Sequence, residues 1–374
     1  MDPQTVFCPN RDCPARGQTG QDNIHIHSRK AHRYLCDVCN KTFTETKGTV
    51  FYRLRTDAEQ VALVLALLAH GCPVCAIVFA FGLDERTVRD WEHRAGHHRE
   101  QVHQHLVQQP RDLGQVQADE IRVKMQAMIV WVAMALQVST RLWLGATISE
   151  HRDETLIFEL RQRVRACALG RPLLFGVDGF RAYRGAIHTV FREPIPTRSL
   201  GRPQLRPWDG IHIAQVVKQY APGHVIGVVR RIVQGTEAQV NCLVQTSQGN
   251  GVIHTAYVER LTATFRARLA GLVRRGRSLL QQTQTLQVGV YLVGSVYNFC
   301  IYHETLRVRV PLYVGRVGRT HWVPRTPAMA AGITDHLWSV SELLRYQVPP
   351  SRWTPPKHRG RPSRAMKELI NKWC

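Results

Sequence analysis

The chain has 374 residues and carries 50 Lys and Arg against 28 Asp and Glu, a formal net charge of +22. Its apolar fraction of 44% is enough for a substantial core, and its length suits two or three domains. The charge surplus favours a polyanionic partner, because neutralising phosphates releases condensed counterions. A basic ribosomal or chromatin protein without chemistry is the simple alternative.

The composition argues against a membrane protein and against a disulfide-stabilised secreted protein. The longest apolar run, Ala127–Leu136, is too short to cross a bilayer as a helix, and the first residues lack the order of a signal peptide. Ten cysteines in a reducing compartment indicate metal ligands or buried thiols. We therefore expect a soluble, cytoplasmic, nucleoid-associated protein that contacts no membrane.

Residues 1–55 are predicted to form a zinc-ribbon element. They contain two cysteine pairs in the motifs CPNRDC and CDVC, namely Cys8 with Cys13 and Cys36 with Cys39. Two short cysteine knuckles that are about twenty residues apart let four thiolates converge on one tetrahedral Zn²⁺. A segment this small depends on the metal for part of its folding energy.

Other metal-binding residue types lie near these pairs. Three histidines between the knuckles are alternative ligands: His25, His27 and His32. Cys72 and Cys75 form a further CxxC pair beside Gly71 and Pro73, and no second pair lies nearby. We interpret that pair as structural.

Residues 56–95 have the pattern of a helix-turn-helix. Thr56 with Glu59 begins a helix as a capping box, Gly82 makes a turn, and Asp84 can cap a polar helix, DERTVRDWEHR. In this interpretation the polar helix enters the DNA major groove and presents Arg86, Thr87 and Arg89. An ordinary three-helix bundle is the alternative. Residues 96–114 are polar and rich in His and Gln, and we expect a linker or an exposed helix there.

Three acidic residues stand where predicted strands or helices end. Asp119 lies on a strand that is followed by two more, MIVWVAMAL and LWLGATI, which together make a meander. A helix then covers about 152–170, and the apolar strand PLLFGVDGF ends at Asp178. Glu259 lies early in a helix over about 255–273, beside an apolar stripe.

This order of strands and helices predicts an α/β fold, a ribonuclease-H-like mixed sheet with flanking helices. Three carboxylates in that plan can hold two Mg²⁺ ions for in-line displacement at phosphorus. Each acid also has an ordinary interpretation: Asp119 as a solvated strand-edge acid, Asp178 as a turn residue, and Glu259 as a charge favoured by the helix dipole.

At these motifs the chain resembles the transposases of the insertion-sequence-one family. The similar segments are QADEIRVK, GVDGFRAY, YVERLTATFRARLAGLVRRGRSL, YNFCIYHETL, CPNRDC…RYLCDVCNKTF and the helices of 56–95. The resemblance covers most of 1–190 and 255–280. It implies a DDE-type transposase, an enzyme that binds double-stranded DNA at element ends and target and acts as a homo-oligomer on DNA.

The resemblance also implies roles for particular residues. Asp119, Asp178 and Glu259 would hold Mg²⁺ or Mn²⁺, and Arg266 would contact DNA. The catalytic domain would span 115–310, with an insertion at about 194–250 that is longer than compact family members carry. That departure leaves three rivals for the glutamate: Glu193, Glu237 and Glu304.

Residues 311–374 are expected to form a C-terminal extension with a mobile, basic, proline-rich tail. Within it HRGRPSR resembles an AT-hook core, in which Arg359 and Arg361 would enter a narrow minor groove. A generic basic tail is the alternative. For the whole chain, a non-catalytic DNA-binding regulator and a related nuclease or integrase are the alternatives to a transposase.

Overall fold

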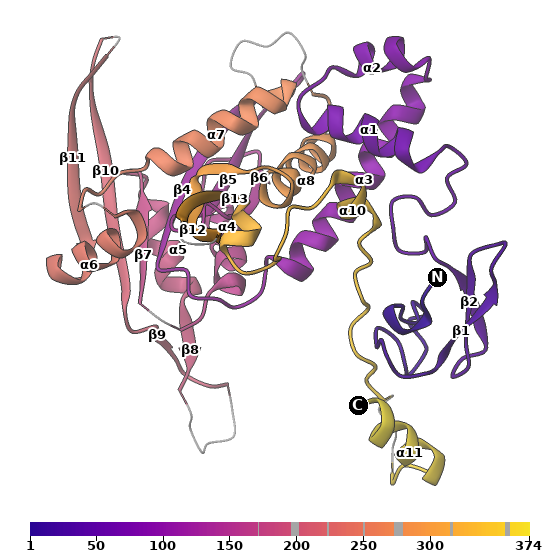
Figure 1. Ribbon diagram of the computed structural model, residues 1–374. Coiled ribbons are helices and arrows are strands. Elements are labelled where there is room, and N and C mark those ends of the chain that lie inside the picture. The colour runs from indigo at the N-terminus through magenta and orange to yellow at the C-terminus, as the bar shows by residue number, and fades with distance from the viewer. Residues whose placement is uncertain are drawn as a thin grey trace. The chain divides into compact units, whose positions relative to one another are not determined.

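The computed structural model describes residues 1–170, 172–195, 202–222, 224–249, 251–272, 280–314, 317–355 and 360–374, and for 311–320 it describes only the backbone. The chain divides into two compact units (Figure 1). Unit 1 combines residues 1–61 with 341–374, and unit 2 is 62–340. The two ends of the sequence therefore share one unit, a division that differs from the consecutive domains expected from the sequence.

Unit 1 is built around a small antiparallel sheet. The 3-10 helix η1 (Pro3–Thr5) precedes three strands, β1 (Ile24–Ser28), β2 (Arg33–Cys36) and β3 (Lys41–Thr44), paired in the order β1-β2-β3. Tyr34 and Phe43 lie opposite each other on β2 and β3 and stack with ring centroids 5.7 Å apart. These two rings lie in the buried core of the unit together with Cys8, Cys13 and Cys36.

The C-terminal segment packs against this core, whereas a mobile tail was expected. Helix α10 (Val340–Arg345) is followed by an extended stretch in which Arg16 donates to the carbonyls of Ser351 and Arg352 at 2.7 and 3.0 Å. Helix α11 (Arg364–Trp373) then buries Trp373 beside the cysteines. Its apolar residues recur at helical spacing, which lets one face of a basic segment join the core: Met366, Leu369, Ile370 and Trp373.

Unit 2 contains a six-stranded mixed sheet in the order β11-β10-β7-β4-β5-β6. Its strands are β4 (Gln115–Lys124), β5 (Ile129–Gln137), β6 (Trp143–Ser149), β7 (Leu173–Val177), β10 (Ile211–Ala221) and β11 (His224–Gln234). Strands β4, β7 and β10 run parallel, and β5, β6 and β11 pair antiparallel with their neighbours. The expected mixed α/β class and the β4-β5-β6 meander are therefore present.

Helices cover both faces of this sheet. They are α4 (Glu154–Cys167), α5 (Ala182–Val190), α6 (Glu237–Gln248), α7 (Ala256–Arg268) and α8 (Thr283–Phe299). Ile121 and Val123 of β4 pack with residues of α7 and α8 in the largest apolar cluster described. Glu120, which points to the opposite face, contacts α5. The helix expected over 255–273 is α7, followed by a 3-10 turn, η2 (Ala270–Leu272).

Three helices precede the sheet: α1 (Ala58–Ala69), α2 (Val74–Phe81) and α3 (Glu85–Leu106). Gly82 ends α2 with a left-handed φ of 62°, and the Asp84 side chain caps α3 at the amide of Arg86. Helix α3 continues through most of 96–114, where a linker or exposed helix was expected. Its polar residues Arg99 and His103 are fully buried, because α8 packs against this helix.

The segment 194–250, expected to be an insertion, contains a strand of the main sheet. β10 pairs in parallel with β7 from Ile211 to Gln215, so this part is continuous with the core. Two short strands, β8 (Arg192–Pro194) and β9 (Leu205–Pro207), precede it. The rest of unit 2 is a hairpin, β12 (His303–Val314) and β13 (Val317–Arg325), and helix α9 (Pro327–Ala330). Among the described residues, no helix is long and apolar enough to cross a membrane.

Candidate functional site

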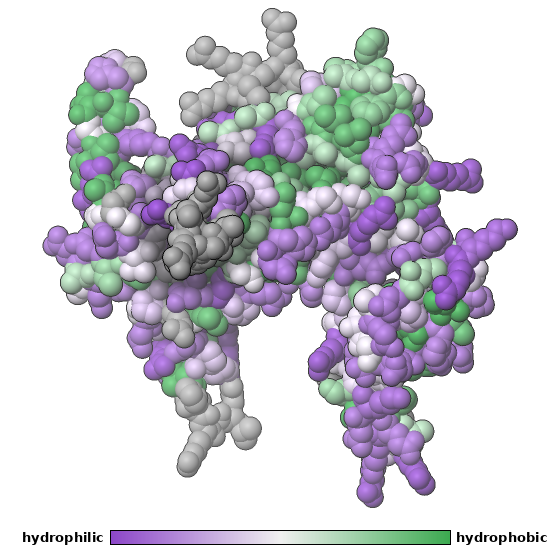
Figure 2. Space-filling model, in the orientation of Figure 1, coloured by the Kyte–Doolittle hydropathy of each residue, from purple (hydrophilic) through white to green (hydrophobic). Residues whose placement is uncertain are grey.

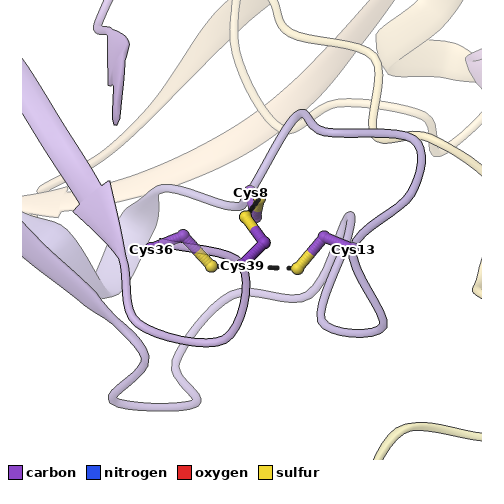
Figure 3. Close-up of side chains that lie close together, drawn as sticks. All are labelled: Cys8, Cys13, Cys36 and Cys39. Carbon is purple, nitrogen blue, oxygen red and sulfur yellow. Dashed lines mark hydrogen bonds between the residues drawn. The ribbon is translucent and has the colours of Figure 1, made fainter. Parts of the chain in front are cut away.

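Four cysteines of unit 1 form a compact group whose ligand atoms all lie within 4.8 Å of one another: Cys8, Cys13, Cys36 and Cys39. The Sγ atoms of Cys8 and Cys39 are 3.7 Å apart, and those of Cys13 and Cys36 are 3.8 Å apart. Figure 3 shows the four sulfurs pointing toward one another from the two knuckles. This group can hold a metal ion such as zinc, as the spacing predicts.

Local backbone geometry and burial suit these thiols to a cation. Asn40 follows the second knuckle with a left-handed φ of 52°, a conformation that asparagine tolerates. Burial raises the pKa of Cys8 and Cys13, and the neighbouring thiols raise it further, so without a cation these sulfurs favour the protonated form. Two of the three alternative histidine ligands have other partners: His25 contacts Asp37, and His32 contacts Glu45.

A second group of polar residues lines a cavity of about 620 Å³ in unit 2, at the carboxyl ends of parallel strands. Asp119 extends from β4, Asp178 follows the last residue of β7, and Glu259 lies in the first turn of α7. All three line this cavity, together with Arg266. The structure thus brings together the three acids that the sequence analysis singled out.

Gln117 positions α7 relative to the strand that carries Asp119. Its Nε2 donates to the carbonyl of His254 at 2.6 Å, and its Oε1 accepts from the amides of Tyr257 and Val258, each at 3.1 Å. The first amides of a helix lack partners within it, so this side chain satisfies two of them. Asp119 is two residues further along the strand and points to the same face, toward Glu259.

Cations of the same chain hold two of the acids. Lys218 of β10 pairs with Glu259 at 2.7 Å. Arg152 Nη2 bridges Glu120 at 2.7 Å and Asp178 at 2.9 Å. Among the described residues, the four cysteines are the only group of three or more His, Cys, Asp or Glu whose ligand atoms all lie within 4.8 Å. The carboxylates therefore share the cavity without meeting at one point.

Charge interactions link the three acids. Burial raises the pKa of Asp119, and the negative charges of Asp178 and Glu259 raise it further. Burial alone would raise the pKa of Glu259, but hydrogen bonds from Lys218 and Thr255 lower it overall. A cation placed among these groups would relieve the repulsion that Asp119 experiences.

Glu120 is a site residue that the sequence analysis did not identify. It is buried on the opposite face of β4, where it accepts hydrogen bonds from Tyr183 and Arg152 and shifts to a raised pKa, mainly because of burial. The fully buried Arg161 lies over the Tyr183 ring at 4.7 Å. The only signal in the sequence was an acid directly after Asp119 in a strand whose neighbours are apolar.

The rival glutamates lie elsewhere. Glu193 pairs with Arg206 at 2.6 Å between β8 and β9, and Glu304 pairs with Arg307 at 3.3 Å on β12. Glu237 is exposed in the first turn of α6. None of the three lines the cavity that contains Asp119.

The expected DNA-contacting residues lie in several places. Arg86 and Arg89 are exposed in the first turns of α3, Thr87 is half-buried between them, and Arg89 pairs with Glu85 and Glu92 within the chain. Arg361 is exposed in unit 1. Arg359 falls outside the described residues. Cys72 lies between α1 and α2, Cys75 lies in the first turn of α2, and both are free thiols.

Comparisons with known proteins leave the family open. No family model matches the chain, and no curated protein matches it significantly. The case for a function therefore depends on the site itself.

Proposed function

We propose that this protein is a DDE-type transposase, which binds the DNA ends of its own element and catalyses metal-dependent strand cleavage and strand transfer. The observation that carries this proposal is one cavity beside β4 and the end of β7 that Asp119, Asp178 and Glu259 all line, although they come from three separate elements. Acids so far apart in sequence share a cavity only if the fold brings them there. Asp119 is half-buried near the negative charges of Asp178 and Glu259, and such like charges favour the binding of a cation or a proton.

The sheet order supports a ribonuclease-H-like fold for the proposed enzyme. An antiparallel meander, β4-β5-β6, continues through β4 into the parallel strands β7 and β10. The acids then fall on the first strand, after the fourth strand and on a later helix. This is the arrangement that the sequence pattern predicted for such a fold.

The donor set suits Mg²⁺ or Mn²⁺. The candidate ligands are carboxylate oxygens, which these hard cations prefer. The pKa of Asp119 is raised first by burial and then by the charges of Asp178 and Glu259, and a cation would relieve that second, repulsive contribution. Bound there, two such ions would activate the attacking hydroxyl and stabilise the leaving oxygen at phosphorus. Lys218 and Arg152 would neutralise Glu259 and Asp178 when no metal is bound, and would be free to contact phosphate once it is.

The other parts of the chain fit DNA recognition in this proposal. The net charge of +22 supplies sequence-independent attraction to phosphates. The α2 and α3 helices with the Gly82 turn would form the helix-turn-helix. Arg86 is exposed in the first turn of α3, the end of the helix that would contact base edges. The four-cysteine element would act as a second DNA-binding module, stabilised by zinc.

The experiment is a strand-nicking assay on plasmid DNA with Mg²⁺ or Mn²⁺. Asp119→Asn and Asp178→Asn should each lower the nicking rate by about 100-fold or more. Even a residue that only hydrogen-bonds to a metal ligand typically changes metal affinity or activity by about 10- to 100-fold, and a ligand itself should matter more. DNA binding in a gel-shift assay should stay near wild type. Glu304→Gln, which removes an exposed acid outside the cavity, is the matched control and should nick normally. Full activity of Asp119→Asn would contradict the proposal.

A non-catalytic DNA-binding regulator is the second candidate. One observation favours it: cations of the chain already neutralise Glu259 and Asp178, as in a site that needs no metal. The two candidates differ in calorimetry. A transposase site should bind Mn²⁺ in the absence of DNA, with binding lost in Asp119→Asn, whereas a regulator should show no such difference.

A further inference from the structure

Two histidines of α3 lie next to each other on the surface of the helix. His93 and His97 are four residues apart, about one helical turn, so both project from the same face. Both side chains are exposed, and their Nε2 atoms are 3.2 Å apart. In the absence of a metal ion, this contact is a hydrogen bond that one neutral ring donates to the other.

The distance between these nitrogens also suits two ligands of one metal ion. Zinc binds imidazole nitrogen at about 2.0–2.1 Å, so two such nitrogens at angles between square-planar and tetrahedral lie about 2.9–3.4 Å apart. The observed separation of 3.2 Å falls within this range. Two histidines at positions i and i+4 of a helix are a recurrent way of bringing two imidazoles to one Zn²⁺.

Helix α8 brings a third polar side chain to the pair. The Nε2 atom of Gln284 lies 3.5 Å from Nε2 of His97. A half-turn of the terminal amide exchanges its nitrogen and its oxygen, and the oxygen can bind a metal ion. Two imidazoles and one amide oxygen would leave a fourth position for water, as in an open zinc site.

The packing of α3 against α8 fixes the backbone beneath these side chains. The two helices lie side by side (Figure 1) and run parallel, as three neighbouring pairs show: His97 with Gln284, Glu100 with Gln287, and His103 with Tyr291. They approach closely at Gly96, where an added Cβ would lie 2.5 Å from Cγ1 of Val288. A site on two packed helices needs little ordering when an ion binds.

Polar side chains on the surface of α3 are ordinary for this chain. Figure 2 shows a largely hydrophilic surface, with apolar patches over α2 and along β10 and β11. Histidines are also numerous, with 18 in the sequence. His93 and His97 stand out because their nitrogens lie at metal-ligand separation and beside a side chain of a second helix.

We propose that His93 and His97, together with Gln284, bind a late first-row divalent metal ion such as Zn²⁺. Imidazole nitrogen suits Zn²⁺, Ni²⁺ and Cu²⁺, whereas Mg²⁺ and Mn²⁺ prefer oxygen ligands, so this site differs in chemistry from the acidic cavity. The ion would join α3, which carries Arg86 in its first turn, to α8. Binding of this ion does not depend on the proposed enzymatic function.

The test is uptake of Zn²⁺ by the full-length protein, purified under reducing conditions and without DNA. Elemental analysis first counts the zinc that is already tightly bound, and Zn²⁺ is then titrated in competition with a chromophoric chelator. We expect the wild type to bind one further ion, and His93→Ala and His97→Ala each to weaken that binding by at least about 10-fold. Gln284→Ala should weaken it less, because water can replace the amide oxygen.

Two further variants serve as controls. His224→Ala removes an exposed histidine at the start of β11 and should bind the additional ion like the wild type. Asp119→Asn changes the acidic cavity and should also keep this ion, which distinguishes failure of this site from failure of the proposed enzyme. Circular dichroism checks that the variants are folded.

Three results would overturn the proposal. The wild type would bind no additional Zn²⁺, or both histidine variants would bind it as tightly as the wild type. In the third case Asp119→Asn would lose the additional ion while the histidine variants kept it, which would assign that ion to the acidic cavity.

Discussion

Mild acid should destabilise unit 2 through His103 of α3. This side chain is fully buried, its Nε2 lies 3.1 Å from the carbonyl of Leu144, and its ring packs against Trp143. Burial, with smaller contributions from the charges of Arg163 and Arg111, lowers its pKa from 6.5 to about 3. The folded protein therefore holds His103 neutral at pH values where the unfolded chain protonates it.

The size of the effect follows from these pKa values. Because the folded-state pKa is depressed, the stabilisation is fully present above pH 6.5 and is lost as the pH falls from 6.5 toward 3. At pH 5 the unfolded histidine lies about 1.5 pH units below its pKa, which lowers the free energy of unfolding by about 2 kcal/mol.

Urea unfolding at pH 7 and pH 5 measures this contribution. His103→Gln keeps a donor for the Leu144 carbonyl but cannot titrate. Between pH 7 and pH 5 its free energy of unfolding should therefore fall by about 2 kcal/mol less than that of the wild type. His97→Gln removes an exposed histidine from the same helix and serves as the control. Equal losses in wild type and His103→Gln would refute the reasoning and would show that the ring protonates without unfolding.

Three further predictions concern the metal group, the acidic cavity and DNA. Cys36→Ser should reduce bound zinc from about one ion per chain to a small fraction of that, measured by elemental analysis of protein purified under reducing conditions, whereas Cys75→Ser should keep it. Gln117→Leu removes the partners of three backbone groups at the start of α7 and should lower the free energy of unfolding by about 1–3 kcal/mol in urea; an unchanged midpoint would contradict the role assigned to this side chain. Arg86→Ala should weaken binding to a specific end sequence more than to random DNA, and equal losses on both would assign α3 a structural role.

Part of the site could be predicted from local pattern. The cysteine spacing is a short-range feature, and one tetrahedral ion constrains it strongly enough to identify all four sulfurs. Asp178 follows a fully apolar strand, and Glu259 borders an apolar helical stripe, so periodicity alone placed both acids at the edge of a buried layer. Asp119 was identified in the same way, because it lies on a predicted strand whose residues alternate between the two faces of the sheet.

Other features depend on contacts that no local pattern records. Residues 96–114 looked exposed because histidine, arginine and glutamine are usually solvated. Yet Arg99 donates to the carbonyl of Leu292, nearly two hundred residues away, and is buried by it. Lys218 and Arg152 likewise gained their roles from pairing across the sheet with Glu259 and Asp178. A polar side chain becomes a core residue only when a distant segment supplies its partner.

The sequence by itself determined the β4-β5-β6 meander, α7, the cysteine group that can hold a metal and the candidate acids, because each follows from periodicity or spacing over a few residues. The tertiary structure decided which elements share a unit. The C-terminal helix α11 joined the cysteine core, and β10 joined the main sheet although it lay in a predicted insertion. Burial of apolar faces places α11 against the cysteine core, and backbone pairing places β10 in the main sheet. Both interactions join segments that are far apart in the chain. Such interactions gain free energy only when both partners are present, so neither segment encodes them alone.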